Sequence, residues 1–84
     1  MTYTYKTQGT CAQAIEIELN DEKIIESVRF IGGCRGNTLG ISALVKGMKA
    51  EDVISRLSGI LCGMKPTSCP DQLSKALRAM LGEN

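Results

Sequence analysis

The hydrophobic period of this chain changes once, at Gly32-Gly33, from the two-residue period of strands to the 3.6-residue period of helices. Before that point, residues 11–19 and residues 24–31 alternate apolar and polar on either side of a polar turn, which predicts a hairpin. Tyr3 and Tyr5 alternate with polar residues and predict an edge strand antiparallel to the first run. Strands followed by helices predict an α+β domain, with a small antiparallel sheet covered on one face by three helices.

The alternation also assigns side chains to the two faces of the predicted hairpin. On the first strand, one face carries Cys11, Gln13, Ile15, Ile17 and Leu19. On the second strand, one face carries Ile24, Glu26, Val28 and Phe30, and the other carries Ile25, Ser27, Arg29 and Ile31. Acidic side chains around the hairpin are expected on its solvated surface.

Three helices are expected after Gly33. The first has Asn37 or Thr38 as its N-cap and ends at Gly47, and its apolar stripe is Leu39, Ile41, Leu44 and Val45. The second begins near Glu51 and Asp52, and it carries Val53, Ile54, Leu57, Ile60 and Leu61, with Cys62 at its end. The third is capped by Ser68 or Cys69, has Pro70 in its first turn, and presents Leu73, Ala76, Leu77, Met80 and Leu81.

Size and charge limit the function. With 84 residues, one Phe and no Trp, the chain has room for one domain, residues 1–84, and none for a cofactor-scale enzyme. Ten Lys and Arg against nine Asp and Glu give a net charge of +1, which disfavours nucleic-acid polymers and anionic membranes as partners. The chain contains no His, which excludes a Ser-His-Asp triad, a Cys-His pair and a mixed Cys/His zinc site. We assign no catalytic residue and do not expect catalysis by this chain alone.

The sequence is typical of a cytoplasmic protein, because its polar start is unlike a secretory signal and no apolar run approaches the ~20 residues of a membrane span. Thiols stay reduced in the cytoplasm, where clustered cysteines bind metal or do redox chemistry more often than they form structural disulfides.

Four cysteines carry the chemistry. Cys11, Cys34, Cys62 and Cys69 each stand at the end of a predicted element, where side chains from distant parts of the chain can converge. Their spacings of 22, 27 and 6 intervening residues do not match the paired knuckles of a zinc ribbon. A metal site, ordinary buried thiols and a redox pair therefore all remain open. The turn 32–37 could also form an anion nest, which leaves nucleotide binding open with weaker support.

Residues 67–71 read Thr-Ser-Cys-Pro-Asp, and the chain resembles the TSCPD domain family named after that pentapeptide. The run 30–37, Gly40-Ile41-Ser42 and Cys62-Gly63 are similar to short, free-standing members with four cysteines. In longer proteins this domain occurs near the C-terminus of cobalamin-dependent ribonucleotide reductases. The resemblance implies a link to deoxynucleotide synthesis and a protein partner, either the reductase or a redox or iron–sulfur protein.

The chain is more distantly similar to the U-type iron–sulfur cluster scaffolds, which also run from hairpin to cysteine turn to helices. That similarity implies that Cys11, Cys34 and Cys69 match the scaffold's three cluster cysteines. Gln13 and Ser68 stand where the scaffold has an aspartate and a histidine, and its chaperone motif is missing from residues 62–66. Cys62 could then supply a fourth thiolate in place of the missing ligand.

These observations give one leading hypothesis and two alternatives. The first is a metal-binding accessory module in which Cys11, Cys34, Cys62 and Cys69 hold zinc or an iron–sulfur cluster. The alternatives are a thiol-redox partner of a reductase that uses Cys62 and Cys69, and an iron–sulfur cluster scaffold or carrier. In each of them Cys69 is expected to be the most ionised thiol, because it stands at the start of a helix.

Overall fold

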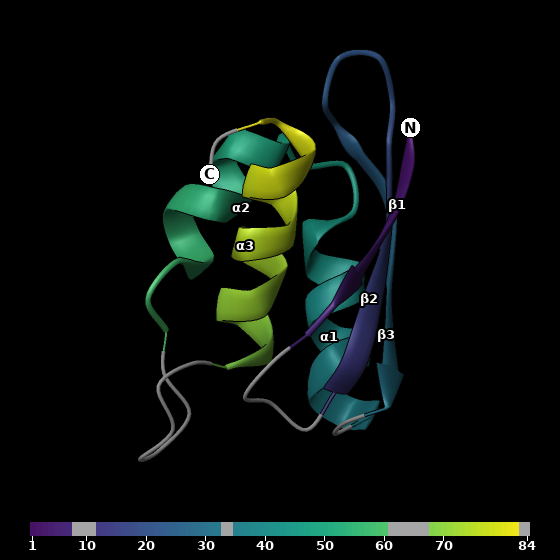
Figure 1. The fold of residues 1–84 in the computed structure, drawn as a ribbon, viewed down its shortest axis with the longest axis vertical. Coiled ribbons are helices and arrows are strands. Elements are labelled where there is room, and N and C mark those ends of the chain that lie inside the picture. The colour runs from purple at the N-terminus through teal and green to yellow at the C-terminus, as the bar shows by residue number, and fades with distance from the viewer. Residues whose placement is uncertain (8–11, 33–34, 61–67, 83–84) are drawn as a thin grey trace.

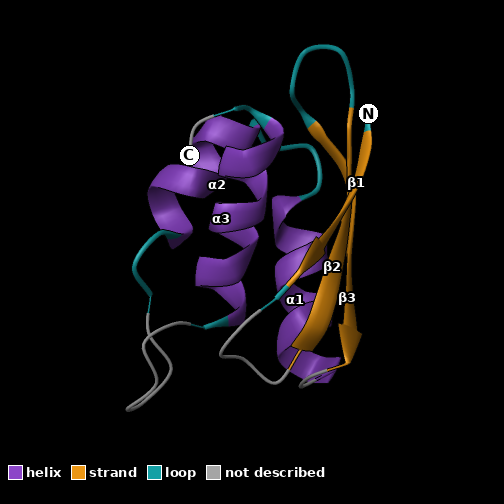
Figure 2. Cartoon of the chain, in the orientation of Figure 1, coloured by secondary structure: helices purple, strands orange, loops and turns teal. Residues whose placement is uncertain are grey.

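Three strands precede three helices in the computed structural model, which describes residues 1–7, 12–32, 35–60 and 68–82. The elements are β1 (Thr2–Lys6), β2 (Ala12–Leu19), β3 (Ile25–Gly32), α1 (Arg35–Val45), α2 (Ala50–Leu57) and α3 (Cys69–Met80). The strands form one antiparallel sheet in the order β1-β2-β3. All three helices lie on the same side of this sheet (Figures 1 and 2). The predicted α+β class and the third, edge strand are confirmed.

The hydrophobic core lies between the sheet and the helices. Its members are Ile15, Ile17, Leu19, Ile25, Val28, Val45, Ala50, Val53, Ile54, Leu73, Ala76 and Leu77, all buried. Burying each Val, Leu or Ile side chain contributes about 1.5–3 kcal/mol, so this cluster supplies most of the favourable free energy of folding. The core is aliphatic, and the single Phe, Phe30, packs at its border.

A break in register between β2 and β3 reverses the predicted faces at the start of β2. Ala12 pairs with Gly32 while Ala14 pairs with Ile31, so Gln13 is an extra residue on β2. Such a bulge shifts the alternation by one position. As a result Ala12 is buried and Gln13 is exposed, opposite to the prediction.

A second break corrects the prediction for the start of β3. Glu18 pairs with Ser27 and Leu19 pairs with Ile25, which leaves Glu26 as the extra residue on β3. Ile25 therefore enters the core and Glu26 faces solvent, whereas strict alternation put Glu26 on the same face as Val28. Both irregularities lie near the ends of the hairpin, and the central residues Ile15, Ile17 and Val28 keep the predicted face.

α1 begins earlier than predicted and buries a different face. It starts at Arg35, so Asn37 and Thr38 lie inside the helix rather than at its cap. Thr38 and Val45 are buried, and Ile41 packs against the core. These three positions follow one face at helical spacing, which turns Leu39 and Leu44 to solvent with exposed fractions of 64% and 73%. The predicted stop at Gly47 is confirmed, with φ +87°.

The other two helices follow the predicted pattern with one correction. α2 buries Val53 and Ile54 as expected, but it ends at Leu57. Ile60 is therefore outside the helix and 43% exposed, and Cys62 does not end α2. α3 starts at Cys69 with Ser68 as its N-cap. Leu73, Ala76 and Leu77 on its predicted face are all buried.

Two glycine substitutions test this backbone in opposite directions. Gly47→Ala should lower the free energy of unfolding by about 1–2 kcal/mol, because Gly47 has φ +87° and a Cβ there is strained. Gly40→Ala in α1 should raise it by about 0.5–1 kcal/mol, because a Cβ at Gly40 meets nothing within 4 Å. Urea unfolding followed by circular dichroism measures both. Equal stability of the two variants would contradict the assigned conformations.

Candidate functional site

Of the four candidate cysteines, Cys69 lies within the described residues. It is the first residue of α3 and is partly buried. Cys11, Cys34 and Cys62 lie outside the described residues, in the segments 8–11, 33–34 and 61–67. The site is therefore built from Cys69 and from the residues that bound those three segments.

The bounding residues lie at one end of the domain. β2 starts, β3 ends, and α1 and α3 start at the same end of the molecule, the lower end in Figure 1. Ala12, which follows Cys11, is the register partner of Gly32 at the end of β3. Cα atoms of partnered residues in an antiparallel pair are about 4.5–5.5 Å apart. The chain therefore enters segment 33–34 beside the point where it leaves segment 8–11.

In segments 8–11 and 61–67, a side-chain hydroxyl group at one end donates a hydrogen bond to a backbone carbonyl oxygen at the other end. Thr7 Oγ1 donates to the Ala12 carbonyl oxygen at 2.5 Å, across segment 8–11. Ser68 Oγ donates to the Ile60 carbonyl oxygen, across segment 61–67. Both hydroxyl-bearing residues are buried, where water competes weakly for the hydrogen bond. The ends of segments 8–11 and 61–67 are thus held together by the described part of the fold.

Ser68 also caps α3. Its backbone is extended, with φ −150°, and its side-chain oxygen accepts a hydrogen bond from the Asp71 N–H at 3.1 Å. Pro70 occupies the first turn, where its fixed φ favours the helix and its missing N–H costs nothing. Cys69 is thereby fixed at the positive end of the helix dipole. A thiolate is stabilised at such a position, so Cys69 is chemically suited to bind a cation or attack a disulfide.

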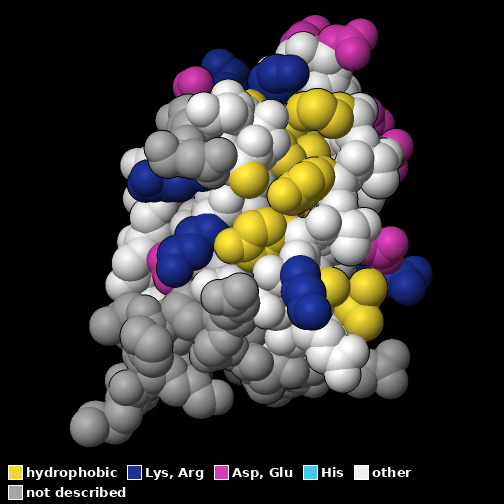
Figure 3. Space-filling view, in the orientation of Figure 1, with side chains coloured by type: hydrophobic (Ala, Val, Ile, Leu, Met, Phe, Trp, Pro, Cys, Tyr) yellow, Lys and Arg dark blue, Asp and Glu magenta, His cyan; other side chains and the backbone are white. Residues whose placement is uncertain are grey.

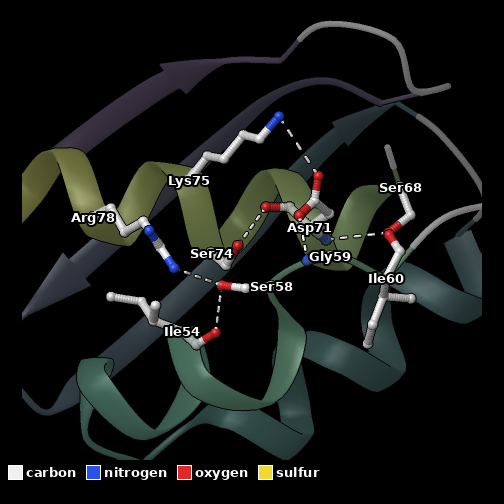
Figure 4. Close-up of polar contacts among 9 residues, drawn as sticks. All are labelled: Ile54, Ser58, Gly59, Ile60, Ser68, Asp71, Ser74, Lys75 and Arg78. Carbon is white, nitrogen blue, oxygen red and sulfur yellow. Dashed lines mark hydrogen bonds and ion pairs between the residues drawn. The ribbon is translucent and has the colours of Figure 1, made fainter. Parts of the chain in front are cut away.

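Asp71 ties α3 to the end of α2 (Figure 4). Its Oδ1 accepts a hydrogen bond from the Gly59 N–H at 2.8 Å, and Lys75 Nζ lies 3.6 Å from Oδ2. The residue is 5% exposed, so the carboxylate is buried but compensated. Gly59 has φ +81°, a conformation that glycine adopts without strain and that ends α2. We call the contacts of Ser68 and Asp71 with Gly59 and Ile60 the α2–α3 clasp.

One further hydrogen bond joins α3 to the end of α2, where the accepting side chain of Ser58 is itself held by the helix. Ser58 Oγ donates to the Ile54 carbonyl oxygen at 2.6 Å, and Arg78 Nη2 donates to Ser58 Oγ at 3.3 Å. Within α3, Ser74 Oγ donates to the Asp71 carbonyl oxygen at 2.7 Å. Polar contacts therefore run from the start of α3 to its last turn, beside the buried Leu73 and Leu77.

Sequence reasoning identified Ser68 and missed Asp71 and Gly59. The signal was available in part, because Ser-x-x-Asp before an apolar run is the spacing of a capping box. In a capping box the carboxylate returns to the N-cap residue, but here Asp71 turns to Gly59, 12 positions earlier in the chain. No local pattern predicts that long-range hydrogen bond.

No group of three or more His, Cys, Asp or Glu side chains able to hold a metal ion occurs within residues 1–7, 12–32, 35–60 and 68–82. These ranges include one of the four cysteines, Cys69. In the same part of the chain, no helix has the length and apolar character needed to cross a membrane.

The fold and the position of Cys69 define a small α+β domain that presents a thiol at a helix N-terminus, with three cysteine-bearing segments bounded at the same end. The sequence model of the TSCPD domain matches residues 1–81, and the chain belongs to this family. No curated protein and no solved structure matches the chain significantly.

Removing the clasp carboxylate should destabilise the domain. Asp71→Ala leaves the Gly59 N–H without its acceptor, and we expect the free energy of unfolding to fall by about 2 kcal/mol. Lys75→Met is the matched control, since it removes only a partner that is 51% exposed and should cost at most about 0.5 kcal/mol. Urea unfolding compares the two variants. Equal losses would mean that the carboxylate acts through Lys75 and not through Gly59.

Proposed function

We propose that this chain is a metal-binding domain whose ligands are the thiolates of Cys11, Cys34, Cys62 and Cys69. The observation that carries the proposal is the shared location of the residues that bound the cysteines. Ala12 and Gly32 are register partners, and the clasp joins Ile60 to Ser68, the residue before Cys69. Four sulfur atoms must come within about 4 Å of one another to bind one metal ion, and this arrangement supports such convergence.

The donor set favours zinc or an iron–sulfur cluster. The chain has four cysteines and no His, so a shared site would be all-thiolate, which suits tetrahedral zinc and iron–sulfur clusters alike. A divalent ion with four thiolates carries a net charge of −2, which Arg35 and Lys65, close in sequence to Cys34 and Cys62, would partly offset. When bound, the metal would add cross-links to a small aliphatic core.

We further propose that the domain works as an accessory module in deoxynucleotide synthesis, in the cytoplasm. This part of the proposal rests on membership of the TSCPD family and on the resemblance, given above, to the domain near the C-terminus of cobalamin-dependent ribonucleotide reductases. The location rests on the polar start of the sequence and the absence of a long apolar run. The partner would be the reductase or a redox or iron–sulfur protein. Recognition by a protein is favoured over recognition by a nucleic-acid polymer, because the net charge is +1.

A thiol-redox role is the second candidate, and the clasp is the observation that favours it. Ile60 and Ser68 are joined by a hydrogen bond, and they lie within two residues of Cys62 and Cys69, respectively. In this role the Cys69 thiolate would attack a disulfide of the partner and Cys62 would resolve the mixed disulfide. The partner would leave as a dithiol, and this chain would keep the Cys62–Cys69 disulfide.

Metal analysis of the four single Cys→Ser variants separates these functions. If the cysteines share one metal, each substitution should lower the bound metal and the free energy of unfolding together, the latter by about 2 kcal/mol or more. A zinc site should be colourless, and an iron–sulfur cluster should be brown with sulfide in stoichiometric amounts. Elemental analysis, absorption spectra and urea unfolding of freshly purified protein provide the measurements.

The four variants serve as controls for one another. A redox pair predicts that Cys62→Ser and Cys69→Ser lose disulfide exchange while Cys11→Ser and Cys34→Ser keep it, with no metal in any of them. Anaerobically purified protein that holds no metal, and whose thiols do not exchange with a disulfide, would contradict both functions.

A further inference from the structure

β1 forms one edge of the sheet and is exposed along most of its length. Thr2, Tyr3, Thr4 and Lys6 are exposed, and Tyr5 is half-buried against the core. β2 covers one side of the strand, and the sheet order gives β1 no neighbour on the other side within the described residues. An uncovered edge strand is a template for pairing with another strand.

The hydrogen bonds to β2 determine which residues face the free edge. The Leu19 N–H donates to the Met1 carbonyl oxygen at 2.8 Å, and the Thr7 N–H donates to the Gln13 carbonyl oxygen at 3.2 Å. In an antiparallel pair, residues alternate between bonding to one neighbour and facing away from it. Since Met1 and Thr7 bond to β2, the odd-numbered residues do so as well. Thr2, Thr4 and Lys6 then direct their N–H and C=O groups to the free edge.

We propose that this edge pairs with β1 of a second copy of the chain, antiparallel and centred on Thr4. In this register Thr4 faces the partner's Thr4, and Thr2 faces the partner's Lys6. All five residues of β1 are then paired, and the groups at the free edge form about six hydrogen bonds. The product is a two-fold symmetric dimer with a continuous six-stranded sheet. Each copy contributes its own β1 to the interface.

The apolar side chains of β1 favour this register. Tyr3 and Tyr5 pair with Ile17 and Ile15 on the helix-covered face, and their rings are 6.4 Å apart. Tyr3 would meet the partner's Tyr5 across the new strand pair, and aromatic cross-strand pairs stabilise sheets. Tyr3 remains 37% exposed in the single chain. Figure 3 shows hydrophobic side chains as a surface band on the face of the molecule that includes β1 and α3.

Charge complementarity identifies the occupant as a second copy. An open depression of about 260 Å³ on the sheet surface is lined by Thr2, Glu16, Glu18, Ser27 and Arg29, among others. Arg29 Nε already lies 3.2 Å from Glu16 Oε1. Across residues 1–7, 12–32, 35–60 and 68–82, neither Lys6 nor Glu18 has an ion-pair partner.

The proposed register brings these two charges together. Thr2 pairs with Glu18, so the partner's Lys6 would stand one strand beyond Thr2 and on the same face as Glu18. Two strand spacings amount to about 10 Å, which the Lys and Glu side chains can span between them. Each dimer would contain this contact twice. A strand from another protein would need the same alternation and a cation at the matching position.

Thr4→Pro tests the strand pairing. Proline removes the N–H that faces the free edge and places its ring there, and it removes no hydrogen bond to β2. We expect sedimentation equilibrium to detect a reversible dimer of the wild-type chain and to give a dissociation constant at least about tenfold higher for Thr4→Pro. Circular dichroism and thermal unfolding at low concentration should match the wild type. A wild-type chain that stays monomeric at millimolar concentration, or a dimer unaffected by Thr4→Pro, would overturn the proposal.

A charge exchange tests the register. Lys6→Glu and Glu18→Lys should each weaken the dimer, because each places like charges across the interface. The double variant Lys6→Glu/Glu18→Lys should recover most of the lost affinity. Within one copy, Lys6 is diagonal to Glu16 and Glu18 is diagonal to Arg29, so each single substitution also places like charges together inside the chain. Thermal unfolding of each variant at low concentration measures this intramolecular cost separately from the dimer affinity. Additive losses in the double variant would overturn the proposed register.

Discussion

The buried carboxylate of Asp71 holds together two parts of the helical layer that are separated in the chain by segment 61–67. It accepts the Gly59 N–H at the end of α2, while Ser68 in front of the same helix donates to Ile60. A core of 12 buried aliphatic side chains does not by itself determine how the ends of such a segment meet. Buried hydrogen bonds determine how these ends meet, because they are directional and because a buried donor or acceptor left without a partner costs free energy. The position of α3, and with it the position of Cys69, depends on this clasp.

The order of strands followed by helices was predictable from the sequence. The hydrophobic period changes at Gly32-Gly33, and this period can be read from neighbouring residues without knowledge of long-range contacts. The start of α3 was equally predictable, since Ser68 and Pro70 are strong local signals. The errors arose where the sheet imposes its own geometry. One extra residue at Gln13 and one at Glu26 shift the strand faces, and alternation contains no information on where a bulge falls.

The error at α1 and the omission of Asp71 have a different cause. α1 offers two candidate apolar faces, and packing against β3 selects the one that includes Thr38 and Val45 over the one that includes Leu39 and Leu44. Thr38 is buried because the orientation of α1 depends on all the contacts of the helix together and not on the hydrophobicity of one residue. For the candidate site, the sequence identified the four cysteines. The clasp around Cys69 could not be foreseen, because its acceptor and donor meet only after α2 and α3 have packed.

The described part of the family pentapeptide is largely structural. Ser68 caps the helix, Pro70 starts it, and Asp71 ties it to α2, which leaves Cys69 as the residue whose side chain these contacts position. A thiol positioned by the fold loses less conformational freedom when it binds than one carried on a free chain. The same reasoning applies to the ends of segments 8–11 and 61–67, which Thr7 and Ser68 close. In the proposed metal site, less of the free energy of metal binding would be offset by the cost of ordering the chain. A domain of this small size would therefore retain its metal more tightly.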